Sequence, residues 1–336
     1  MEYIRLGSTG LKVSRLCLGC MSYGLPGESN PWALNEEQSR PYIQRALEAG
    51  INFFDTANVY SSGMSETVLG NTLRDFTPRD EVVIATKLFF PMGQAPNDRG
   101  LSRKHVVEGT DAALARLGLD YVDLVFCHRA DLHTPVEETV RAMNHVIDQG
   151  KALYWGTSEW PATRILEAFH VARRERLVPP LMEQPQYNLL HRERVEREYA
   201  PLYERFGLGT TIWSPLAGGL LTGKYNEGVP QGTRSTLEGY EWLRSRFEGE
   251  QAMANIEKVR KLAPIADDLG CTQAQLAIAW CLVNPRVSTV ITGASRSEQV
   301  VENMAAMEVV ERLTPEVLER IESVVGNRPE TEPDWR

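Results

Sequence analysis

The sequence has no excess of positive charge and lacks a long hydrophobic run. Its 336 residues include 36 Lys and Arg against 45 Asp and Glu, which gives a formal net charge of -9. Proteins that hold nucleic acid or anionic membrane surfaces carry the opposite balance, so we expect no nucleic-acid partner. No stretch approaches the roughly 18 apolar residues of a membrane helix, so we expect no membrane insertion.

Cysteine is scarce, and its count of five is odd, so at least one thiol stays unpaired. The first residues also lack the basic segment and apolar run of a secretory signal. Cys17 and Cys20 have the spacing of a redox motif, but a loop rich in Gly, Pro and Asn follows them where such motifs need a helix N-terminus. No second cysteine pair would complete a zinc site. We therefore expect a cytoplasmic protein without a metal.

Short apolar runs alternate with longer amphipathic stretches along the chain. Near-continuous apolar runs are typical of parallel strands covered on both faces. Eight such strands separated by helices predict an α/β fold, either a closed (β/α)8 TIM barrel or an open doubly wound sheet. Because no G-x-G-x-x-G motif follows the first strand, the barrel is favoured. The predicted strands are Arg15–Leu18, Ile51–Asp55, Val82–Thr86, Val122–Phe126, Ala152–Gly156, Leu181–Gln184, Thr210–Trp213 and Ser288–Thr292.

The N-terminal segment predicts a β-hairpin ahead of the first barrel strand. Tyr3–Leu6 and Lys12–Leu16 would be its arms, and Gly7–Gly10 its turn. A C-terminal helical extension is expected beyond the last strand. No composition break or low-complexity linker interrupts the chain, so residues 1–336 are predicted to form a single domain.

Helix boundaries are marked by capping signals. Thr134–Glu137 and Thr272–Gln275 each have the pattern of a capping box, and the first of them places Pro135 at the first helical position. Gly50 and Gly150 stand where helices should end.

Titratable side chains follow three successive predicted strands. Asp55, Lys87 and His128 stand at or just beyond the strand ends, and Tyr60 lies five residues after Asp55. In a barrel the carboxyl ends of all strands meet at one rim, where active sites are built. Each residue alone has an ordinary reading as a loop charge, a satisfied polar group or a packed aromatic ring. Their joint occurrence favours an active site.

These residue types suit proton transfer to a carbonyl oxygen. A phenol has a pKa near ~10, which a neighbouring ammonium should lower. Asp55 would keep Lys87 charged and oriented, and His128 would orient the substrate carbonyl while a hydride reaches its carbon. A barrel hydrolase using Asp55 with other carboxylates is an alternative, but it gives Lys87 no role.

Several segments resemble the aldo-keto reductases. Phe54–Ala57 with Tyr60 and Gly70 resembles the first signature of that family, and Lys87 and His128 match its catalytic Lys and active-site His. The similarity runs from Leu6 to Asn303 and is greatest to the potassium-channel β-subunit-like reductases. The segments shared with that subgroup are Glu137–Met143, Tyr154–Ser158, Trp213–Ala217 and Gly293–Ser295.

The resemblance implies a (β/α)8 barrel that reduces aldehydes or ketones with NADPH. It implies that Tyr60 is the general acid, that Lys87 and Asp55 tune it, and that His128 orients the carbonyl. Animal channel β subunits tend to have Asn at the His128 position, so the complete tetrad favours an active enzyme. The alternative that the resemblance allows is an NADP(H)-sensing regulatory protein with slow reductase activity, docked on a channel. Relatives of this kind are often tetramers, so the resemblance also implies a homotetramer.

The resemblance further implies that loops after the fifth to eighth strands hold NADPH or NADP+. Trp213–Gly218 and Lys224 would fold over the pyrophosphate, with Arg234 reaching the same region. Ser158 and Gln184 would hold the nicotinamide carboxamide, above a ring contact from Tyr187. Glu159 stands where channel subunits have an Arg, so that family contact is not carried over.

The segment after the eighth strand would hold the adenosine end, because N–H groups at a helix start favour an anion. Arg296 or Ser295 would bind the 2′-phosphate, and Glu302 and Asn303 the adenine. The complete predicted cofactor set is Cys20, Met21, Asp55, Ser158, Gln184, Tyr187, Trp213, Ser214, Pro215, Leu216, Ala217, Gly218, Lys224, Arg234, Gly293, Ser295, Arg296, Gln299, Glu302 and Asn303.

The substrate is expected to be a small molecule with a carbonyl group. Tyr23 and Trp32, in the first strand-to-helix loop, are predicted to line an apolar substrate pocket, with plain packing as the alternative. Gln231–Gly249 is long for a loop and is interpreted as a cover over cofactor or substrate, or else as a surface helix.

Overall fold

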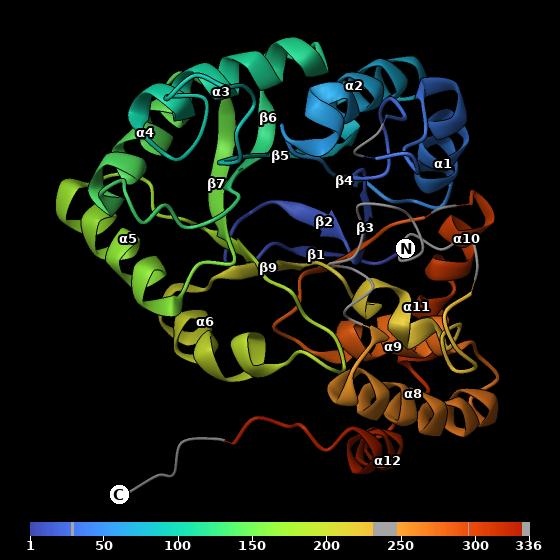
Figure 1. The fold of residues 1–336 in the computed structure, drawn as a ribbon. Coiled ribbons are helices and arrows are strands. Elements are labelled where there is room, and N and C mark those ends of the chain that lie inside the picture. Colours follow the sequence, from blue (N-terminus) through green and yellow to red (C-terminus); the bar gives the residue numbers. More distant parts are fainter. Residues whose placement is uncertain (28–29, 231–246, 295, 331–336) are drawn as a thin grey trace, which may run out of the picture.

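The computed structural model describes residues 1–27, 30–230, 247–294 and 296–330. Its centre is a closed parallel barrel with strand order β10-β3-β4-β5-β6-β7-β8-β9 (Figure 1). The barrel predicted from the sequence is therefore confirmed. The barrel strands are β3 (Leu16–Gly19), β4 (Phe53–Asp55), β5 (Val83–Leu88), β6 (Val122–Cys127), β7 (Ala152–Ser158), β8 (Met182–Gln184), β9 (Gly209–Ile212) and β10 (Thr289–Thr292).

Alternation along each strand decides which side chains enter the barrel. Leu124 and Phe126 of β6 pack with Phe53 and Met182 in an interior cluster, whereas Val125 joins the layer between barrel and helices. Because strand side chains alternate with a period of two, the residue that follows Phe126 by two also points inward. The same inward parity holds two residues beyond the interior residues Phe53 of β4, Ala85 of β5 and Met182 of β8. These positions are Asp55, Lys87 and Gln184.

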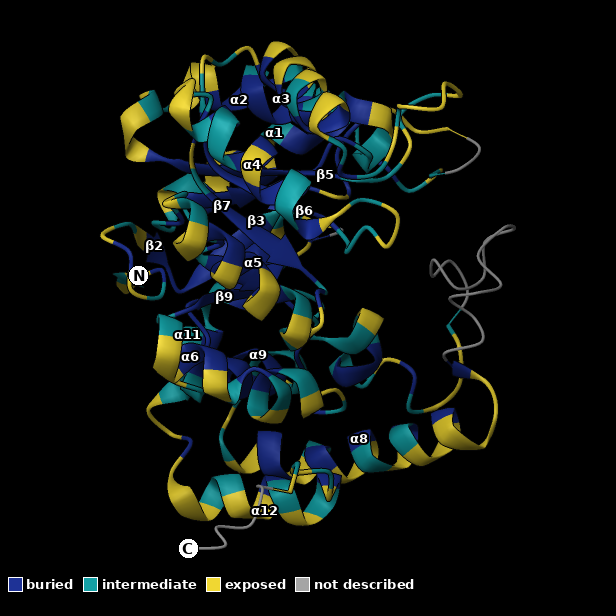
Figure 2. Ribbon diagram, turned by 90° about the vertical axis from the view of Figure 1, so that its left-hand side faces the viewer, coloured by how far each residue is buried: buried dark blue, intermediate teal, exposed yellow. Residues whose placement is uncertain are grey.

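Helices cover the outside of the barrel, with buried inner faces and exposed outer faces (Figure 2). Most follow their strand directly, as expected for repeated βα units. The helices are α1 (Glu36–Glu48), α2 (Met64–Phe76), α3 (Arg103–Leu117), α4 (Val136–Asp148), α5 (Ala162–Glu175), α6 (Ala200–Phe206), α8 (Glu250–Asp268), α9 (Gln273–Val283), α10 (Glu298–Met304), α11 (Ala306–Val310) and α12 (Pro315–Val325).

The predicted hairpin is present and closes the amino end of the barrel. β1 (Tyr3–Arg5) pairs antiparallel with β2 (Lys12–Ser14). Leu6 and Val13 are fully buried in the interior cluster, so their side chains fill this end of the barrel. Gly7 permits the close approach, because a Cβ there would lie 2.4 Å from the carbonyl oxygen of Gly207.

The predicted C-terminal helical extension is formed by α11 and α12. Arg192 ties α12 to the barrel loops through an ion pair with Glu322 at 2.5 Å. Lys258 of α8 donates a hydrogen bond to the carbonyl oxygen of Val325 at 2.5 Å. α12 therefore packs against α8, and α11 packs against α9, so the extension covers the helix layer and not the barrel mouth.

The predicted capping box at Thr134 is wrong. The N-cap of α4 is Pro135, without a side-chain cap, and the Thr134 hydroxyl instead donates to Asp131 Oδ2 at 2.7 Å. The Asp131 carboxylate also accepts the backbone N–H groups of His133, in the same loop, and of Leu101, in the loop before α3. The capping box at Thr272 is confirmed, and Gly50 and Gly150 follow helix ends with positive φ.

The barrel strands differ from the predicted ranges mainly at their ends. β4 begins at Phe53 and not at Ile51, because Ile51 and Asn52 form the link between the turn after α1 and the strand. β5 and β7 run further than predicted, to Leu88 and Ser158. Lys87 and Ser158 thus lie within strands and not after them, which fixes their backbones more firmly.

Within the described part of the chain, no helix is long and apolar enough to cross a membrane. Cys17 and Cys20 are buried free thiols, so the redox spacing forms no bridge. No group of three or more His, Cys, Asp or Glu among the described residues is placed to hold a metal ion.

Candidate active site

A buried ion pair lies at the carboxyl end of the barrel. The Lys87 Nζ donates to Asp55 Oδ2 at 2.6 Å and to the carbonyl oxygen of Thr56 at 2.7 Å. Strand parity explains the meeting, because Asp55 and Lys87 lie two residues beyond the interior residues Phe53 and Ala85. The Lys87 side chain is 0% exposed.

Tyr60 completes the pair from a tight turn after β4. Its Oη lies 3.3 Å from Lys87 Nζ. The turn is η1 (Tyr60–Gly63), where Ser61 and Ser62 adopt φ of 47° and 52°. These left-handed conformations are costly for residues with a Cβ, and they persist where the surroundings hold them. Asn30 contributes by donating to Ser61 Oγ at 2.6 Å.

His128 stands next to Tyr60, at the inward position after β6. Its ring meets that of Tyr60 edge-on with centroids 5.9 Å apart, and that of Phe90 edge-on at 4.9 Å. Burial, reinforced by the positive charges of Lys87 and Arg129, holds the pKa of His128 well below its ordinary value. The ring is therefore neutral near pH 7, and it can share a hydrogen bond with a carbonyl oxygen without adding charge.

The expected fall in the pKa of Tyr60 is wrong for this structure. Burial raises the pKa of the phenol, and the opposing effect of Lys87 is smaller. Burial disfavours the ammonium of Lys87 as well, but Asp55 and then Tyr60 outweigh it and raise the pKa of Lys87. The result at neutral pH is a protonated phenol beside a permanent cation. Such a phenol can donate a proton to a developing alkoxide.

Gln184 and Ser158 extend the site along β8 and β7. Gln184 Nε2 donates to Asp55 Oδ1 at 2.9 Å, and Ser158 Oγ donates to the carbonyl oxygen of Gln184 at 2.9 Å. Asp55 is thereby held on both oxygens, by Lys87 and by Gln184. The structure brings these predicted residues to the tetrad directly.

Trp213 lies against the interior cluster at the end of β9, and Glu159 fixes its indole. Trp213 Nε1 donates to Glu159 Oε1 at 3.0 Å, and Arg194 forms an ion pair with Glu159 at 2.5 Å. Glu159 itself has φ of 58°. The sequence did not predict that Glu159 would hold Trp213, although it shows a Glu where channel β subunits have an Arg.

The loop after β9 forms a backbone cradle. Ser214, Ala217, Gly218 and Gly219 all have positive φ, and the Gly218 N–H donates to Ser214 Oγ at 3.3 Å. The Lys224 Nζ would lie 3.1 Å from a Cβ on Gly219, so the ammonium covers this backbone. A loop of left-handed turns beside a lysine suits phosphate, because its backbone dipoles and the ammonium both favour an anion. Pro215 and Leu216 are part of the same loop.

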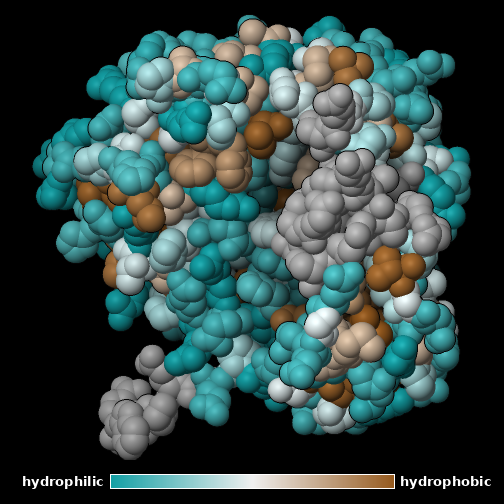
Figure 3. All heavy atoms as spheres, in the orientation of Figure 1, coloured by the Kyte–Doolittle hydropathy of each residue, from teal (hydrophilic) through white to brown (hydrophobic). Residues whose placement is uncertain are grey.

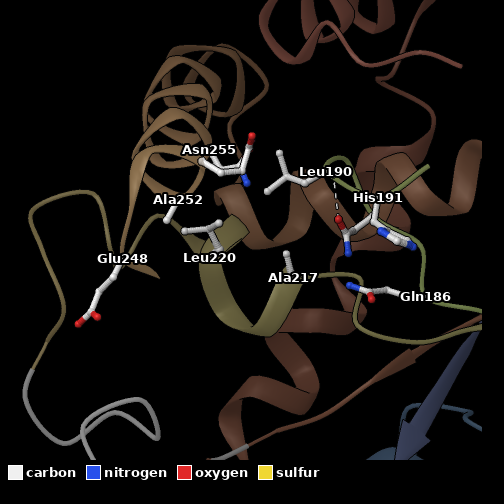
Figure 4. A pocket seen from close by; sticks show the side chains of 10 residues that line it. Gln186, Leu190, His191, Ala217, Leu220, Glu248, Ala252 and Asn255 are labelled. Carbon is white, nitrogen blue, oxygen red and sulfur yellow. Dashed lines mark hydrogen bonds between the residues drawn. The ribbon is translucent and has the colours of Figure 1, made fainter. Parts of the chain in front are cut away.

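A separate cavity of about 310 Å³ lies behind this loop (Figure 4). Gln186 and His191 line one side, Ala217 and Leu220 of η4 (Ala217–Thr222) the floor, and Asn255 of α8 the other side. None of the tetrad residues lines it. In the space-filling view, the face over the barrel is hollowed near its centre, where the tetrad mouth is expected (Figure 3).

The predicted adenosine-binding residues gather where β10 leads into α10. Gly293 is exposed, and its carbonyl oxygen accepts a hydrogen bond from Asn303 Nδ2 at 3.3 Å. The Arg296 N–H donates to Gln299 Oε1 at 3.3 Å. Glu302 lies one residue before Asn303 on α10. Arg234 and Ser295 lie outside the described residues, as does most of the predicted cover segment.

Three predicted contacts meet a different environment. Tyr187 is 1% exposed, stacks on Trp280 of α9 at 5.1 Å and donates to Glu196, so its ring lies in the helix layer and not beneath a ligand. Tyr23 is 0% exposed and packs edge-on against Tyr42, so the packing alternative holds and the pocket-lining prediction is corrected. The side chain of Cys20 is buried as well. By contrast, Met21 is exposed and Trp32 half-buried at the rim.

The fold and the tetrad together define a barrel oxidoreductase. The model of the Aldo/keto reductase family matches residues 15–325, and the chain belongs to this family. A rice protein (Oryza sativa subsp. japonica) named "Probable voltage-gated potassium channel subunit beta" is 51% identical over 339 residues, covering 100% of both chains. An Arabidopsis thaliana protein of the same name is 50% identical over the same span and coverage.

Proposed function

We propose that this protein reduces aldehydes or ketones to alcohols with NADPH. The observation that carries the proposal is the chain of contacts from Asp55 through Lys87 Nζ to Tyr60 Oη, at 2.6 Å and 3.3 Å, beside a neutral His128. This arrangement supplies a proton donor, a fixed cation and a carbonyl-orienting group at one mouth of the barrel. Family membership supports the same reaction class.

The residues of this chain perform the proton half of the reaction. A carbonyl oxygen placed between Tyr60 Oη and the His128 ring accepts a hydrogen bond from the phenol. As negative charge develops on that oxygen, Tyr60 delivers its proton, and the fixed ammonium of Lys87 stabilises the phenolate that remains. Asp55 and Gln184 keep Lys87 in place, so no reorganisation of the pair is needed during the transfer.

The donor set of this structure fits a phosphorylated dinucleotide. The cradle from Ser214 to Gly219 with Lys224 would hold the pyrophosphate, and Arg296 the adenosine phosphate. Ser158 and Gln184 would hold the carboxamide, and Trp213, packed over the barrel interior, offers the aromatic face that Tyr187 cannot. When bound, NADPH supplies the hydride that reaches the carbonyl carbon.

The test is NADPH oxidation, followed by absorbance, with a panel of aliphatic and aromatic aldehydes and ketones. We expect turnover with some of them, and a loss of about 10²- to 10⁴-fold in kcat in Tyr60→Phe. NADPH binding, measured by quenching of tryptophan fluorescence, should persist in that variant. Wild-type turnover in Tyr60→Phe would refute the proton-donor role, and absence of NADPH binding in the wild type would refute the function.

A second candidate is an NADP(H)-sensing subunit of a potassium channel, docked as a cytoplasmic homotetramer. The names of two full-length relatives at 51% and 50% identity favour it. Co-purification with a channel, together with turnover too slow to sustain metabolism, would support this role. Fast multiple turnover by a protein that binds no channel would argue for the enzyme alone.

A further inference from the structure

Arg129 places a guanidinium at the catalytic mouth. It follows His128 directly, and its Nη1 donates to the carbonyl oxygen of His128 at 2.5 Å and to Ser158 Oγ at 3.3 Å. Its Cζ lies 5.7 Å from the ring centroid of Phe90. The side chain therefore reaches from Phe90, in the loop after β5, to Ser158 at the end of β7, next to His128.

This cation is not neutralised by the residues that the structure describes. Among the ion pairs formed by those residues, none includes Arg129. Two acids next to its contacts are already engaged: Glu159, which follows Ser158, and Asp131, two residues after Arg129. Glu159 accepts from Trp213 and pairs with Arg194, while Asp131 accepts from Thr134 and from two backbone N–H groups.

Arg129 lies close to the residues that would hold the reacting atoms. Its charge lowers the pKa of His128, after burial and Lys87, and it is also felt by Tyr60. Phe90 lies between His128 and Arg129. Its ring meets the His128 ring edge-on at 4.9 Å and lies beneath the guanidinium of Arg129. A substrate whose carbonyl oxygen meets Tyr60 would extend along Phe90 towards Arg129, which is partly exposed.

We propose that Arg129 is a specificity-determining residue, which selects carbonyl substrates that carry a carboxylate. The inference rests on the proposed reductase function and names its substrate class: aldehydes or ketones with an anionic group, and preferably an aromatic ring between it and the carbonyl. Guanidinium binds carboxylate through charge-assisted, planar hydrogen bonds. The flat face of Phe90 suits the ring.

The experiment compares substrates that differ by one charge. The probes are 3-carboxybenzaldehyde and 4-carboxybenzaldehyde, each against its methyl ester, which keeps a similar shape and electron demand. The readout is the ratio of kcat/KM for acid over ester, because absolute rates also reflect the contacts of Arg129 with Ser158 and His128. The variants are Arg129→Gln and Arg129→Lys, with Arg5→Gln of the exposed hairpin strand β1 as the control for net charge.

We expect the wild type to favour at least one acid over its ester, and this preference to weaken as salt rises. Arg129→Gln should lower the acid-to-ester ratio about 10- to 100-fold, the loss expected for a charge-assisted hydrogen bond. Arg129→Lys should fall between the two, and Arg5→Gln should match the wild type.

Other outcomes overturn the inference while leaving the reductase function in place. An unchanged ratio in Arg129→Gln would show that Arg129 does not select the anion. An equal loss for acid and ester together with weaker NADPH binding would assign Arg129 to the cofactor instead. Only a failure of the wild type to reduce any of the four probes or the wider carbonyl panel would count against the proposed function itself.

Discussion

Lys87 and Asp55 form an ion pair with a 2.6 Å separation and side chains only 0% and 4% exposed. Water cannot compensate either charge if its partner is removed. We therefore expect Lys87→Met to lower the free energy of unfolding by about 3–5 kcal/mol as well as to stop reduction. Adding Asp55→Asn should restore much of the stability but none of the activity. Urea unfolding followed by circular dichroism measures both. Equal stability of the single and double variants would contradict the role of an uncompensated charge.

The neutral state of His128 predicts the pH dependence of activity. Because its pKa is depressed by burial, Lys87 and Arg129, the ring should not take up a proton between about pH 8 and about pH 6. We expect no loss of kcat/KM over that range from this residue. The pH profiles of the wild type and of His128→Gln should have the same shape, with the variant slower throughout. An inflection near the ordinary histidine value in the wild type, absent from His128→Gln, would show that the ring does titrate.

Glu183 of β8 predicts a pH dependence of stability. Burial raises its pKa to about 8, despite hydrogen bonds from Thr157 and from the Trp160 N–H. A raised pKa means that the folded state binds the proton more tightly. Its contribution is therefore complete below the ordinary value of 4.5 and is lost as pH rises through about 8.

Glu183→Gln mimics the protonated acid and should remove that loss. The stability of the variant relative to the wild type should rise with pH by up to about 1.4 kcal/mol per unit between about pH 5 and about pH 8. The surface variant Glu204→Gln is the matched control and should show no such trend. Urea titrations at several pH values test this, and parallel curves for Glu183→Gln and wild type would rule the titration out.

Arg296 predicts a preference between dinucleotides. It is exposed two residues before α10, where its guanidinium would meet a 2′-phosphate. Arg296→Met should weaken NADPH binding about tenfold or more and leave NADH binding nearly unchanged. Lys12→Met, on the hairpin at the opposite end, controls for charge. Kd values from fluorescence quenching decide the matter. Equal weakening of NADPH and NADH binding would show that Arg296 does not bind the 2′-phosphate.

The sequence predicted the residues that strand alternation positions. Asp55, Lys87, His128 and Gln184 share the inward parity of the interior cluster, so knowing the strands was enough to bring them together. The chain order of short apolar runs and capping signals likewise predicted the barrel and its hairpin. These features depend on local periodicity, which a sequence displays directly.

What could not be predicted depends on loop geometry. Phe90, Arg129 and Glu159 lie in turns whose backbone is set by tertiary contacts, and Glu159 even adopts a positive φ. Tyr187 and Tyr23 were misplaced for the same reason, because a loop aromatic can turn towards the mouth or into the helix layer with equal local propensity. The net direction of the pKa of Tyr60 also required the depth of burial, which no motif contains.

The hairpin closes the amino end of the barrel with Leu6 and Val13, so among the described residues the tetrad opens towards the carboxyl end. Under the proposed function, the dinucleotide and the carbonyl compound enter through the same opening. The ligand that binds deeper cannot dissociate until the other has dissociated. A barrel closed at one end therefore predicts ordered binding of the two ligands. It also predicts product inhibition by the alcohol, which would bind to the complex of the enzyme with NADP+.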